Sequence, residues 1–222
     1  MNAVKRIVIL GTGGNCLDIL ETIRSINASS PTYDCIGFLD DDPALQNASF
    51  LGIPVLGPLD KAPSLGDVFF VNGIGSPATY LHKPEIIAKT RMANDRFETI
   101  LHPSAQVSSS ATLGPGTVVL QNATIASQAK VGAHTIILPN SVLSHDDVVG
   151  AYSCIAGGVC VSGSVTIGRC CYLGGNCSII EHVRIGDNSL IGLGSVVLED
   201  VPEGSVYVGN PARFLRPSGP PG

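Results

Sequence analysis

Aliphatic residues recur at every sixth position between residues 107 and 197, without an insertion or a gap. The sixteen residues at these positions are Val107, Leu113, Val119, Ile125, Val131, Ile137, Leu143, Val149, Ile155, Val161, Ile167, Leu173, Ile179, Ile185, Ile191 and Val197. A period of six fits neither an α-helix, at about 3.6 residues per turn, nor an isolated strand, at about 2. It is typical of a hexapeptide β-solenoid, in which short strands turn corners and each corner carries an inward aliphatic side chain.

Two further patterns share this register. The residue four positions after each aliphatic residue is small in fourteen of fifteen cases, which indicates tight corners with little interior room. The exception is Asp147, two residues after His145. Glycine recurs every eighteen residues from Gly114 to Gly186. Three hexapeptides are therefore expected to form one coil, which gives about five coils in all.

The first hundred residues show a different pattern, in which short apolar runs alternate with turns and helical segments. Strands are expected at 5–10, 35–39, 67–72 and 97–101, and helices at 17–26 and 84–93. This order predicts a small, mostly parallel α/β domain. The last six residues, PSGPPG, offer no core side chains and are expected to lack fixed structure.

Three unusual turns follow the predicted strands of this domain. They contain Gly11 and Gly13, Asp40 and Asp41, and Gly73 and Gly75. The carboxyl ends of parallel strands share one edge of a sheet, and ligands bind there. Glycines before a helix let the backbone approach a phosphate, although Cys16 replaces the third glycine of a dinucleotide motif. A domain this small favours a mononucleotide or nucleotide sugar over NAD as the ligand. The alternative is that the glycine turn only connects a strand to a helix and binds no ligand.

Charge and composition argue against several classes of binding partner. The net charge of −5 and the absence of a basic run argue against nucleic acid. No apolar stretch approaches the roughly 18 residues of a membrane span, and the N-terminus lacks a signal-peptide pattern. The seven cysteines include no C-x-x-C pair and are interpreted as small buried residues in a reducing cytoplasm, without a metal.

His145 is the strongest candidate for chemistry. It lies in the only hexapeptide whose small position is charged, beside Asp146 and Asp147. A neutral imidazole accepts a proton near pH 7, and either carboxylate could fix its tautomer. The chain has no G-x-S-x-G elbow, which favours direct attack by an acceptor over an acyl-enzyme. His82 and His102 are interpreted as structural, and His134 and His182 are expected to face solvent.

Four features together carry a family resemblance: the ladder, H-P-S-A at 102–105 with S-H-D at 144–146, G-N-P-A at 209–212, and the glycine-turn domain. The chain resembles the two-domain hexapeptide acyltransferases that acetylate nucleotide-linked amino sugars. The bacillosamine-pathway and perosamine-type N-acetyltransferases are the most similar, and the sialic acid O-acetyltransferases are more distant. The resemblance implies a Rossmann-like nucleotide-sugar-binding domain at 1–101, a left-handed parallel β-helix acyltransferase domain at 102–216, and a tail at 217–222. It also implies a homotrimer that holds acetyl-CoA between neighbouring β-helices.

The resemblance further implies roles for individual residues. His145 would be the general base for the sugar amine, and Asp146 would orient it. The residues implied to contact acetyl-CoA are Cys154, Gly163, Gly175, Leu193, Gly209, Asn210, Pro211 and Ala212. Those implied to contact the nucleotide sugar are Gly11, Gly13, Gly14, Asn15, Asp40, Asp41, Gly73 and Gly75. Bacillosamine-type members carry histidines where this chain has Asn15 and Cys154, so contacts to the acceptor and to the acetyl group are expected to differ.

The predicted reaction is acetyl transfer from acetyl-CoA to the amino group, at C4, of a nucleotide-linked amino-dideoxysugar such as perosamine or a bacillosamine precursor. It would serve polysaccharide biosynthesis in the cytoplasm. The alternative is O-acetylation of a sialic-acid-like or other sugar hydroxyl. Two further readings are a metal hydratase using His134, His145 and His182, and a scaffold that binds nucleotide sugars without catalysis. The sequence selects neither the sugar nor the nucleotide.

Overall fold

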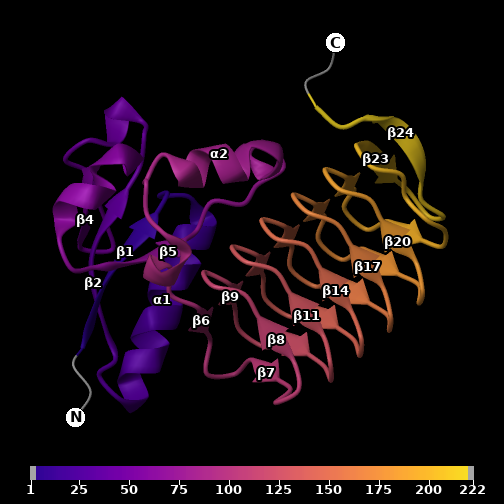
Figure 1. Ribbon diagram of the computed structural model, residues 1–222, viewed down its shortest axis with the longest axis horizontal. Helices are drawn as coiled ribbons and strands as arrows, with labels where there is room; N and C mark the ends of the chain where they lie inside the picture. Colours follow the sequence, from indigo (N-terminus) through magenta and orange to yellow (C-terminus); the bar gives the residue numbers. More distant parts are fainter. Residues whose placement is uncertain (1–3, 220–222) are drawn as a thin grey trace.

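The structure is a computed structural model that describes residues 4–219, and it consists of a small α/β unit followed by a long coiled stack of strands (Figure 1). The sheet of the first unit, the α/β sheet, has the strand order β3-β4-β2-β1-β5. Its strands are β1 (Lys5–Leu10), β2 (Tyr33–Leu39), β3 (Ser49–Phe50), β4 (Ile53–Gly57) and β5 (Phe69–Asn72). All pairs are parallel except β3 with β4.

The helices of this unit follow the sequence prediction in place but not in length. They are α1 (Gly14–Ser29) and α2 (Lys83–Ala88), with 3-10 turns η1 (Pro43–Leu45), η2 (Leu59–Leu65), η3 (Tyr80–His82) and η4 (Asn94–Arg96). α1 buries Ile19, Leu20 and Ile23 against the α/β sheet. The expected helix at 84–93 stops at residue 88, and β3 and β4 lie in a segment where proline and glycine obscured the strand pattern.

The predicted fold class, a small α/β domain followed by a left-handed parallel β-helix, is confirmed. Two-residue strands recur every six residues and pair in parallel from one coil to the next. They are β6 (Ile100–Leu101), β7 (Gln106–Val107), β8 (Thr112–Leu113), β9 (Val118–Val119), β10 (Thr124–Ile125), β11 (Lys130–Val131), β12 (Ile136–Ile137), β13 (Val142–Leu143), β14 (Val148–Val149), β15 (Cys154–Ile155), β16 (Cys160–Val161), β17 (Thr166–Ile167), β18 (Tyr172–Leu173), β19 (Ser178–Ile179), β20 (Arg184–Ile185), β21 (Leu190–Ile191) and β22 (Val196–Val197).

The aliphatic ladder occupies the strands and not the corners, which corrects the sequence interpretation. Each ladder residue is the second residue of a strand, and its side chain fills the interior of the coils. The corner follows two and three positions later. The second corner residue has a φ between +50° and +71° at every step from Gly116 to Gly194. Glycine, asparagine and aspartate adopt this left-handed region most readily.

The glycines that recur every eighteen residues are required by the contact between coils. A Cβ on Gly114 would lie 2.5 Å from the backbone nitrogen of Ala133, and one on Gly132 would lie 2.4 Å from that of Ala151. Any side chain there would push the coils apart. The eighteen-residue period is therefore the spacing at which one corner of the stack brings backbone against backbone.

The strands of the coils form three sheets. Each sheet takes every third strand. The docking sheet contains β6, β9, β12, β15, β18 and β21. The second coil sheet contains β7, β10, β13, β16, β19 and β22, and the third contains β8, β11, β14, β17 and β20. The α/β unit packs on the docking sheet, where Val118, Ile136 and Cys154 join one core with Ile7 and Ile9. The last strand expected for the α/β domain, at 97–101, appears as β6 and pairs with β9 of the coils.

A hairpin extends the docking sheet beyond β21 at the end of the coils. It consists of β23 (Ser205–Val208) and β24 (Arg213–Pro217), which are antiparallel. The tail expected from residue 217 therefore begins inside a strand, and the amide of Ser218 donates to the carbonyl of Gly204 at 2.7 Å. Its last three residues, 220–222, lie outside the described residues. Within 4–219, neither helix has the length and apolar character needed to cross a bilayer.

Candidate functional site

A cavity of about 570 Å³ opens at the carboxyl edge of the α/β sheet and extends to the docking sheet. The structure brings all eight sequence-predicted nucleotide-sugar residues to its wall. Its lining consists of Gly11, Thr12, Gly13, Gly14, Asn15, Cys16, Asp40, Asp41, Leu59, Gly73, Ile74, Gly75, Ser76, Pro77, Thr79, Ile86, Lys89, Leu138 and Tyr172. Leu138 and Tyr172 belong to the coils, so the cavity lies where the two parts of the chain meet.

The glycine turn presents the start of α1 to this cavity. Gly11 has a φ of +91°, and nothing lies within 4 Å of a Cβ built on Gly13 or Gly14. The first turn of α1 carries no acidic residue. Its free N–H groups and the helix dipole therefore favour an anion such as a phosphate. Cys16 fills the space beside Gly73, where a Cβ would lie 2.4 Å from the thiol, so this cysteine packs the turn.

Two carboxylates follow β2 at the next strand along the edge. Asp40 accepts hydrogen bonds from the hydroxyl of Thr12 at 2.7 Å and from the amide of Asp42 at 3.0 Å. Asp41 accepts from the amide of Leu59 at 2.9 Å and from the ammonium of Lys89 at 2.6 Å. Partial burial alone would raise the pKa of Asp41, but the bonds from Lys89 and Leu59 outweigh it and lower that pKa, so the carboxyl stays ionised.

Lys89 was not predicted from the sequence. It lies at the end of α2, 48 residues from its partner, and no local pattern distinguishes it from other exposed lysines. Only the return of α2 across the edge of the α/β sheet places its ammonium in the cavity wall.

Asn15 and Cys154 meet at one carbonyl. The amide of Asn15 donates to the oxygen of Gly75 at 2.8 Å, and the thiol of Cys154 lies 3.8 Å from the same oxygen. Cys154 is fully buried, and burial raises the pKa of its thiol to about 11. Sequence analysis grouped Cys154 with the acetyl-CoA residues. The structure places it under the α/β unit instead, where this single chain leaves it no accessible surface.

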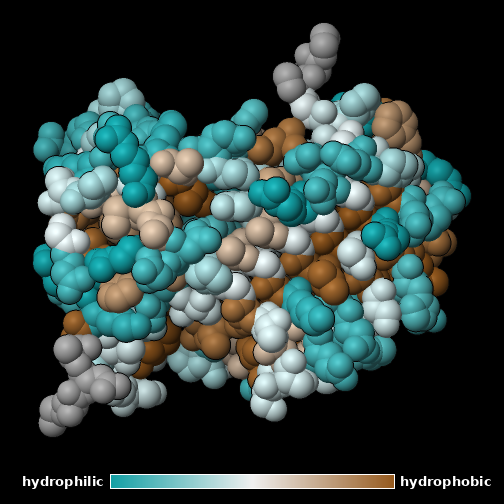
Figure 2. Space-filling view, viewed as in Figure 1, coloured by the Kyte–Doolittle hydropathy of each residue, from teal (hydrophilic) through white to brown (hydrophobic). Residues whose placement is uncertain are grey.

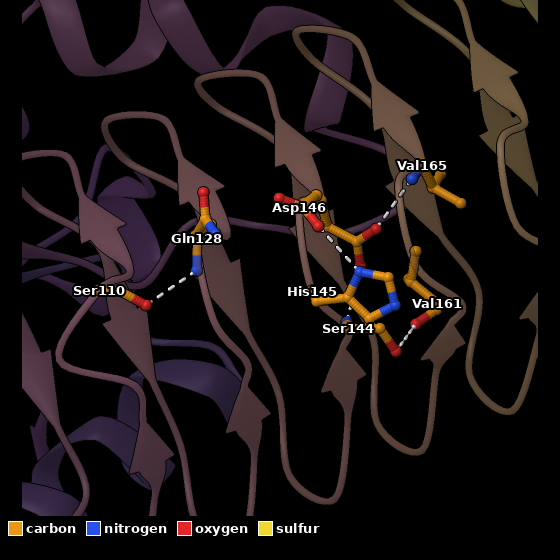
Figure 3. Close-up of polar contacts among 8 residues, drawn as sticks. Ser110, Gln128, Ser144, His145, Asp146, Val161 and Val165 are labelled. Carbon is orange, nitrogen blue, oxygen red and sulfur yellow. Dashed lines mark hydrogen bonds and ion pairs between the residues drawn. The ribbon is translucent and has the colours of Figure 1, made fainter.

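His145 and Asp146 form an exposed pair on the coils (Figure 3). They occupy the corner between β13 and β14, with side chains 63% and 50% exposed. Nδ1 of His145 lies 2.9 Å from Oδ2 of Asp146. With Nδ1 committed to the carboxylate, Nε2 is the ring nitrogen left to exchange a proton. Asp146 has a φ of +62°, as expected for the second residue of a corner.

Gly163 lies against this imidazole from the same corner of the next coil. A Cβ on Gly163 would lie 2.5 Å from both Cε1 and Nε2 of His145. The missing side chain therefore leaves the space that the ring occupies. The sequence predicted that Gly163 contacts acetyl-CoA. In the structure Gly163 also makes room for the imidazole of His145.

Asp147 stabilises the backbone beneath the pair. Its carboxylate is fully buried and accepts hydrogen bonds from the amide of Ser144 at 2.7 Å and from the amide of Val165 at 2.9 Å. Burial raises the pKa of Asp147 to about 7, although both bonds oppose the shift. One bond holds the turn that carries His145, and the other reaches the coil that carries Gly163 (Figure 3).

The remaining acetyl-CoA candidates gather near the end of the coils. Leu193 is 79% exposed, and its Cδ1 lies 3.3 Å from a Cβ built on Gly175. The loop 209–212 joins β23 to β24. The amide of Gly209 donates to the hydroxyl of Ser195, and the amide of Ala212 donates to the carbonyl of Val196 at the start of β22. Asn210 and Pro211 lie at the tip of this loop. These residues form one group, separate from Gly163 beside His145.

Within one chain, the cavity and His145 lie on different sides of the coils. We call the corner between the second and third coil sheets the distal corner, and it carries 109–110, 127–128, 145–146, 163–164 and 181–182. The α/β unit and the cavity lie on the docking sheet, which is the side opposite this corner. The site predicted from the sequence is therefore divided between two faces of the molecule.

The other histidines do not assemble with His145. His134 is buried at a different corner, against Phe97 and stacked on Tyr152 with ring centroids 5.1 Å apart. The expectation that it faces solvent was wrong, and burial lowers its pKa to about 4. His182 is exposed. Among residues 4–219, no three His, Cys, Asp or Glu side chains lie close enough to hold a metal ion.

A family model and a curated enzyme each match part of this chain. Residues 6–81 match the PglD N-terminal domain. The UDP-N-acetylbacillosamine N-acetyltransferase of Bacillus subtilis (strain 168) is 30% identical over 119 residues, which are 53% of this chain and 52% of that enzyme. The match thus spans about half the length of the curated relative.

Solved structures resemble the chain over nearly all of its length. The acetyltransferase domain of PglB from Neisseria gonorrhoeae FA1090, in complex with acetyl coenzyme A, is 26% identical with a TM-score of 0.84, covering 96% of this chain and 100% of that one. PerB from Caulobacter crescentus, in complex with CoA and GDP-perosamine, is 28% identical with a TM-score of 0.82, covering 96% and 99%.

Proposed function

We propose that this chain, which carries a PglD N-terminal domain and shares the fold of nucleotide-sugar N-acetyltransferases, transfers an acetyl group from acetyl-CoA to the amine of a nucleotide-linked amino-dideoxysugar. The observation that carries the proposal is the exposed His145–Asp146 pair, in a chain whose other part holds a cavity suited to a nucleotide. In this proposal the amine is the one at C4, as the resemblance of the sequence implies.

His145 acts as the general base in this proposal. Nε2 takes a proton from the amine as the amine nitrogen attacks the thioester carbonyl carbon, while Asp146 holds the Nδ1 proton and stabilises the imidazolium. The C–N bond forms, the C–S bond breaks, and the proton passes from His145 to the departing CoA sulfur. No covalent acyl-enzyme is required, because the acceptor reacts directly with the activated thioester.

Acetyl-CoA lies along the outside of the coils in this arrangement. The group formed by Gly175, Leu193 and residues 209–212 receives the nucleotide end of CoA, and Gly163 lies beside the reacting thioester. A backbone amide at Gly163 suits the developing oxyanion, because a residue without a side chain admits close approach. Cys154 contributes to the wall between the two parts of the chain and not to this groove.

A second copy of the chain completes the site. Because the cavity and His145 lie on different faces, the sugar held by one chain reaches the histidine of a neighbour. A closed homotrimer gives every chain one neighbour on each side and so forms three equal sites. Apolar residues exposed on the coils, including Val148, Ile180 and Leu198, provide contact surface for this assembly, and apolar side chains gather over the coils in Figure 2.

The direct test is release of CoA from acetyl-CoA with a panel of UDP-, GDP- and dTDP-linked 4-amino-dideoxysugars. We expect turnover with at least one, and His145→Ala should lower kcat/KM by about 10²-fold or more. Absence of turnover with the whole panel would refute the proposal. The matched sugars with a hydroxyl in place of the amine test O-acetylation, and faster turnover of these would favour that alternative.

A further inference from the structure

The strand order of the α/β sheet arranges the cavity wall in sequence. Along the carboxyl edge come the end of β4 with Leu59, the end of β2 with Asp40 and Asp41, the glycine turn before α1, and the end of β5 with Gly75. The coils follow on the β5 side. The cavity is therefore a strip that runs from the acidic turn, past a helix N-terminus, to the solenoid.

A nucleotide sugar fits this strip in one direction. The diphosphate lies at the centre, over the free N–H groups at the start of α1. The sugar then lies toward the coils, because in the proposed assembly the neighbour that supplies the histidine packs against the coils. The nucleoside then lies on the β2 and β4 side. Asp40, directly after β2, takes the position from which an acidic residue binds ribose hydroxyls in such sheets.

The next pair along the strip is Asp41 with Lys89. Their charged atoms are 2.6 Å apart, the two side chains are 38% and 53% exposed, and Leu59 and Ile86 provide apolar surface beside them. The Asp41 carboxylate has one bond at each oxygen and keeps lone pairs free, while the Lys89 ammonium has further donors. The pair therefore offers an acceptor and a donor side by side.

We propose that Asp41 and Lys89 read the base and select one with a lactam edge, an N–H next to a C=O, as in uracil, thymine and guanine. This inference rests on the proposed function, which sets the direction of the ligand. The carboxylate of Asp41 accepts the ring N–H, and the ammonium of Lys89 donates to the adjacent carbonyl.

The same pair disfavours cytosine and adenine. These bases present an amino group where a lactam has its carbonyl, and an unprotonated ring nitrogen where it has its N–H. The amino group would then face the ammonium, donor against donor, and the ring nitrogen would face the carboxylate, acceptor against acceptor. Opposed polar groups weaken binding relative to paired ones, so discrimination of about tenfold is expected.

The test is calorimetric binding of UDP, dTDP, GDP, CDP and ADP to the full chain without sugar or acetyl-CoA. At least one of the first three should bind at least about tenfold more tightly than both CDP and ADP. Lys89→Met should weaken that ligand about tenfold and reduce its advantage over CDP and ADP. Lys61→Met is the matched control, because Lys61 lies in the adjacent η2 turn but donates to Leu56 and does not line the cavity.

Two results would overturn the inference. One is binding of CDP or ADP as tight as that of the best lactam nucleotide, and the other is an unchanged ranking in Lys89→Met. These results are independent of catalysis. Acetyl transfer with an unselective nucleotide site would reject the base-reading pair alone, whereas the expected ranking without any acetyl transfer would reject the proposed reaction and not the pair.

Discussion

At the scale of single residues, His145 depends on a neighbour that has no side chain. Gly163 lies in the next coil at the same corner, and the imidazole occupies the volume that a Cβ would fill. A general base must be held within a fraction of an ångström of its productive position, and a displacement of about 1 Å can cost 10²-fold in rate. The glycine therefore determines where Nε2 points.

Gly163→Ala is expected to displace the ring and lower kcat/KM by about tenfold or more. Thermal unfolding should change little, because the displaced side chain is exposed. Gly157→Ala is the matched control. It changes the same turn position at another corner, where a Cβ meets nothing closer than 3.4 Å. Equal activity of the two variants would show that the contact with Gly163 does not position His145.

Asp147 lies next to the candidate base, but its own role is structural. Its charge breaks the pattern of small residues, which directed attention to His145, yet the carboxylate is buried and bonded to two backbone amides. The equivalent residue of the next coil corner, Ser153, accepts from the amide of Cys171 in the same way. The departure from the pattern therefore stabilises the turn that presents the histidine.

Asp147→Val places at this position the residue found at 159 and 165. It leaves the buried amide of Val165 without a partner, whereas the amide of Ser144 keeps its longer bond to the carbonyl of Val161 at 3.3 Å. We expect a loss of about 1–3 kcal/mol in the free energy of unfolding, because a buried unpaired amide carries that cost. Denaturant titration measures it. Asp147→Ser, which can still bond Val165, should lose less, and a valine variant as stable as the native chain would contradict the role given to this carboxylate.

At the scale of elements, the contact between the α/β unit and the docking sheet contains polar groups that sequence analysis did not place. Lys83, at the start of α2, is fully buried and donates to the carbonyl of Ser153, and burial lowers its pKa to about 8. His134 packs between Phe97 and Tyr152 in the same contact. Its pKa is lowered to about 4, first by burial and second by the charge of Lys83.

His134 should make the stability of the chain depend on pH. Its pKa in the folded chain lies below its ordinary value of 6.5, so between about pH 6.5 and pH 4 the unfolded chain binds a proton that the folded chain does not. Stability is then lost as the pH falls through this window. The midpoint of thermal unfolding should fall less steeply for His134→Asn than for the native chain, since asparagine also adopts this corner at 122 and 140.

His182→Asn is the control for this measurement, because His182 occupies a corner with the same positive φ but is exposed. It should keep the native slope. Equal slopes for the native chain and His134→Asn would mean that folding does not lower the pKa of His134.

The elements that could be predicted are those whose cause is local. The ladder from Val107 to Val197 directly predicts the interior residues of the coils, and the glycine turn predicts the start of α1. The strand β4 was missed because Pro54 interrupts its pattern, although β4 pairs with β2. Lys89 and Lys83 were missed because their partners lie 48 and 70 residues away in sequence. A polar contact between residues far apart in the sequence produces no periodic pattern.

At the scale of the whole molecule, the candidate site is divided between two faces. The cavity lies on the docking sheet, and His145 lies on the distal corner. Neither part performs acetyl transfer alone in the proposed mechanism. An assembly in which the cavity of one chain meets the distal corner of its neighbour joins them, and it also covers apolar residues exposed on the coils.

The most direct measurement is the activity of mixed assemblies made from two inactive variants. His145→Ala removes the base. Gly14→Leu blocks the cavity at the first residue of α1, where a Cβ meets no neighbour within 4 Å and the helix tolerates leucine. Each variant alone should be inactive. In an equal mixture assembled at random, about a quarter of the sites should combine an intact cavity with an intact neighbouring histidine.

The account predicts that co-expression of the two variants restores acetyl transfer to about a quarter of the native rate per chain. Activity no greater than the sum of the separate variants, in assemblies shown to contain both chains, would contradict it.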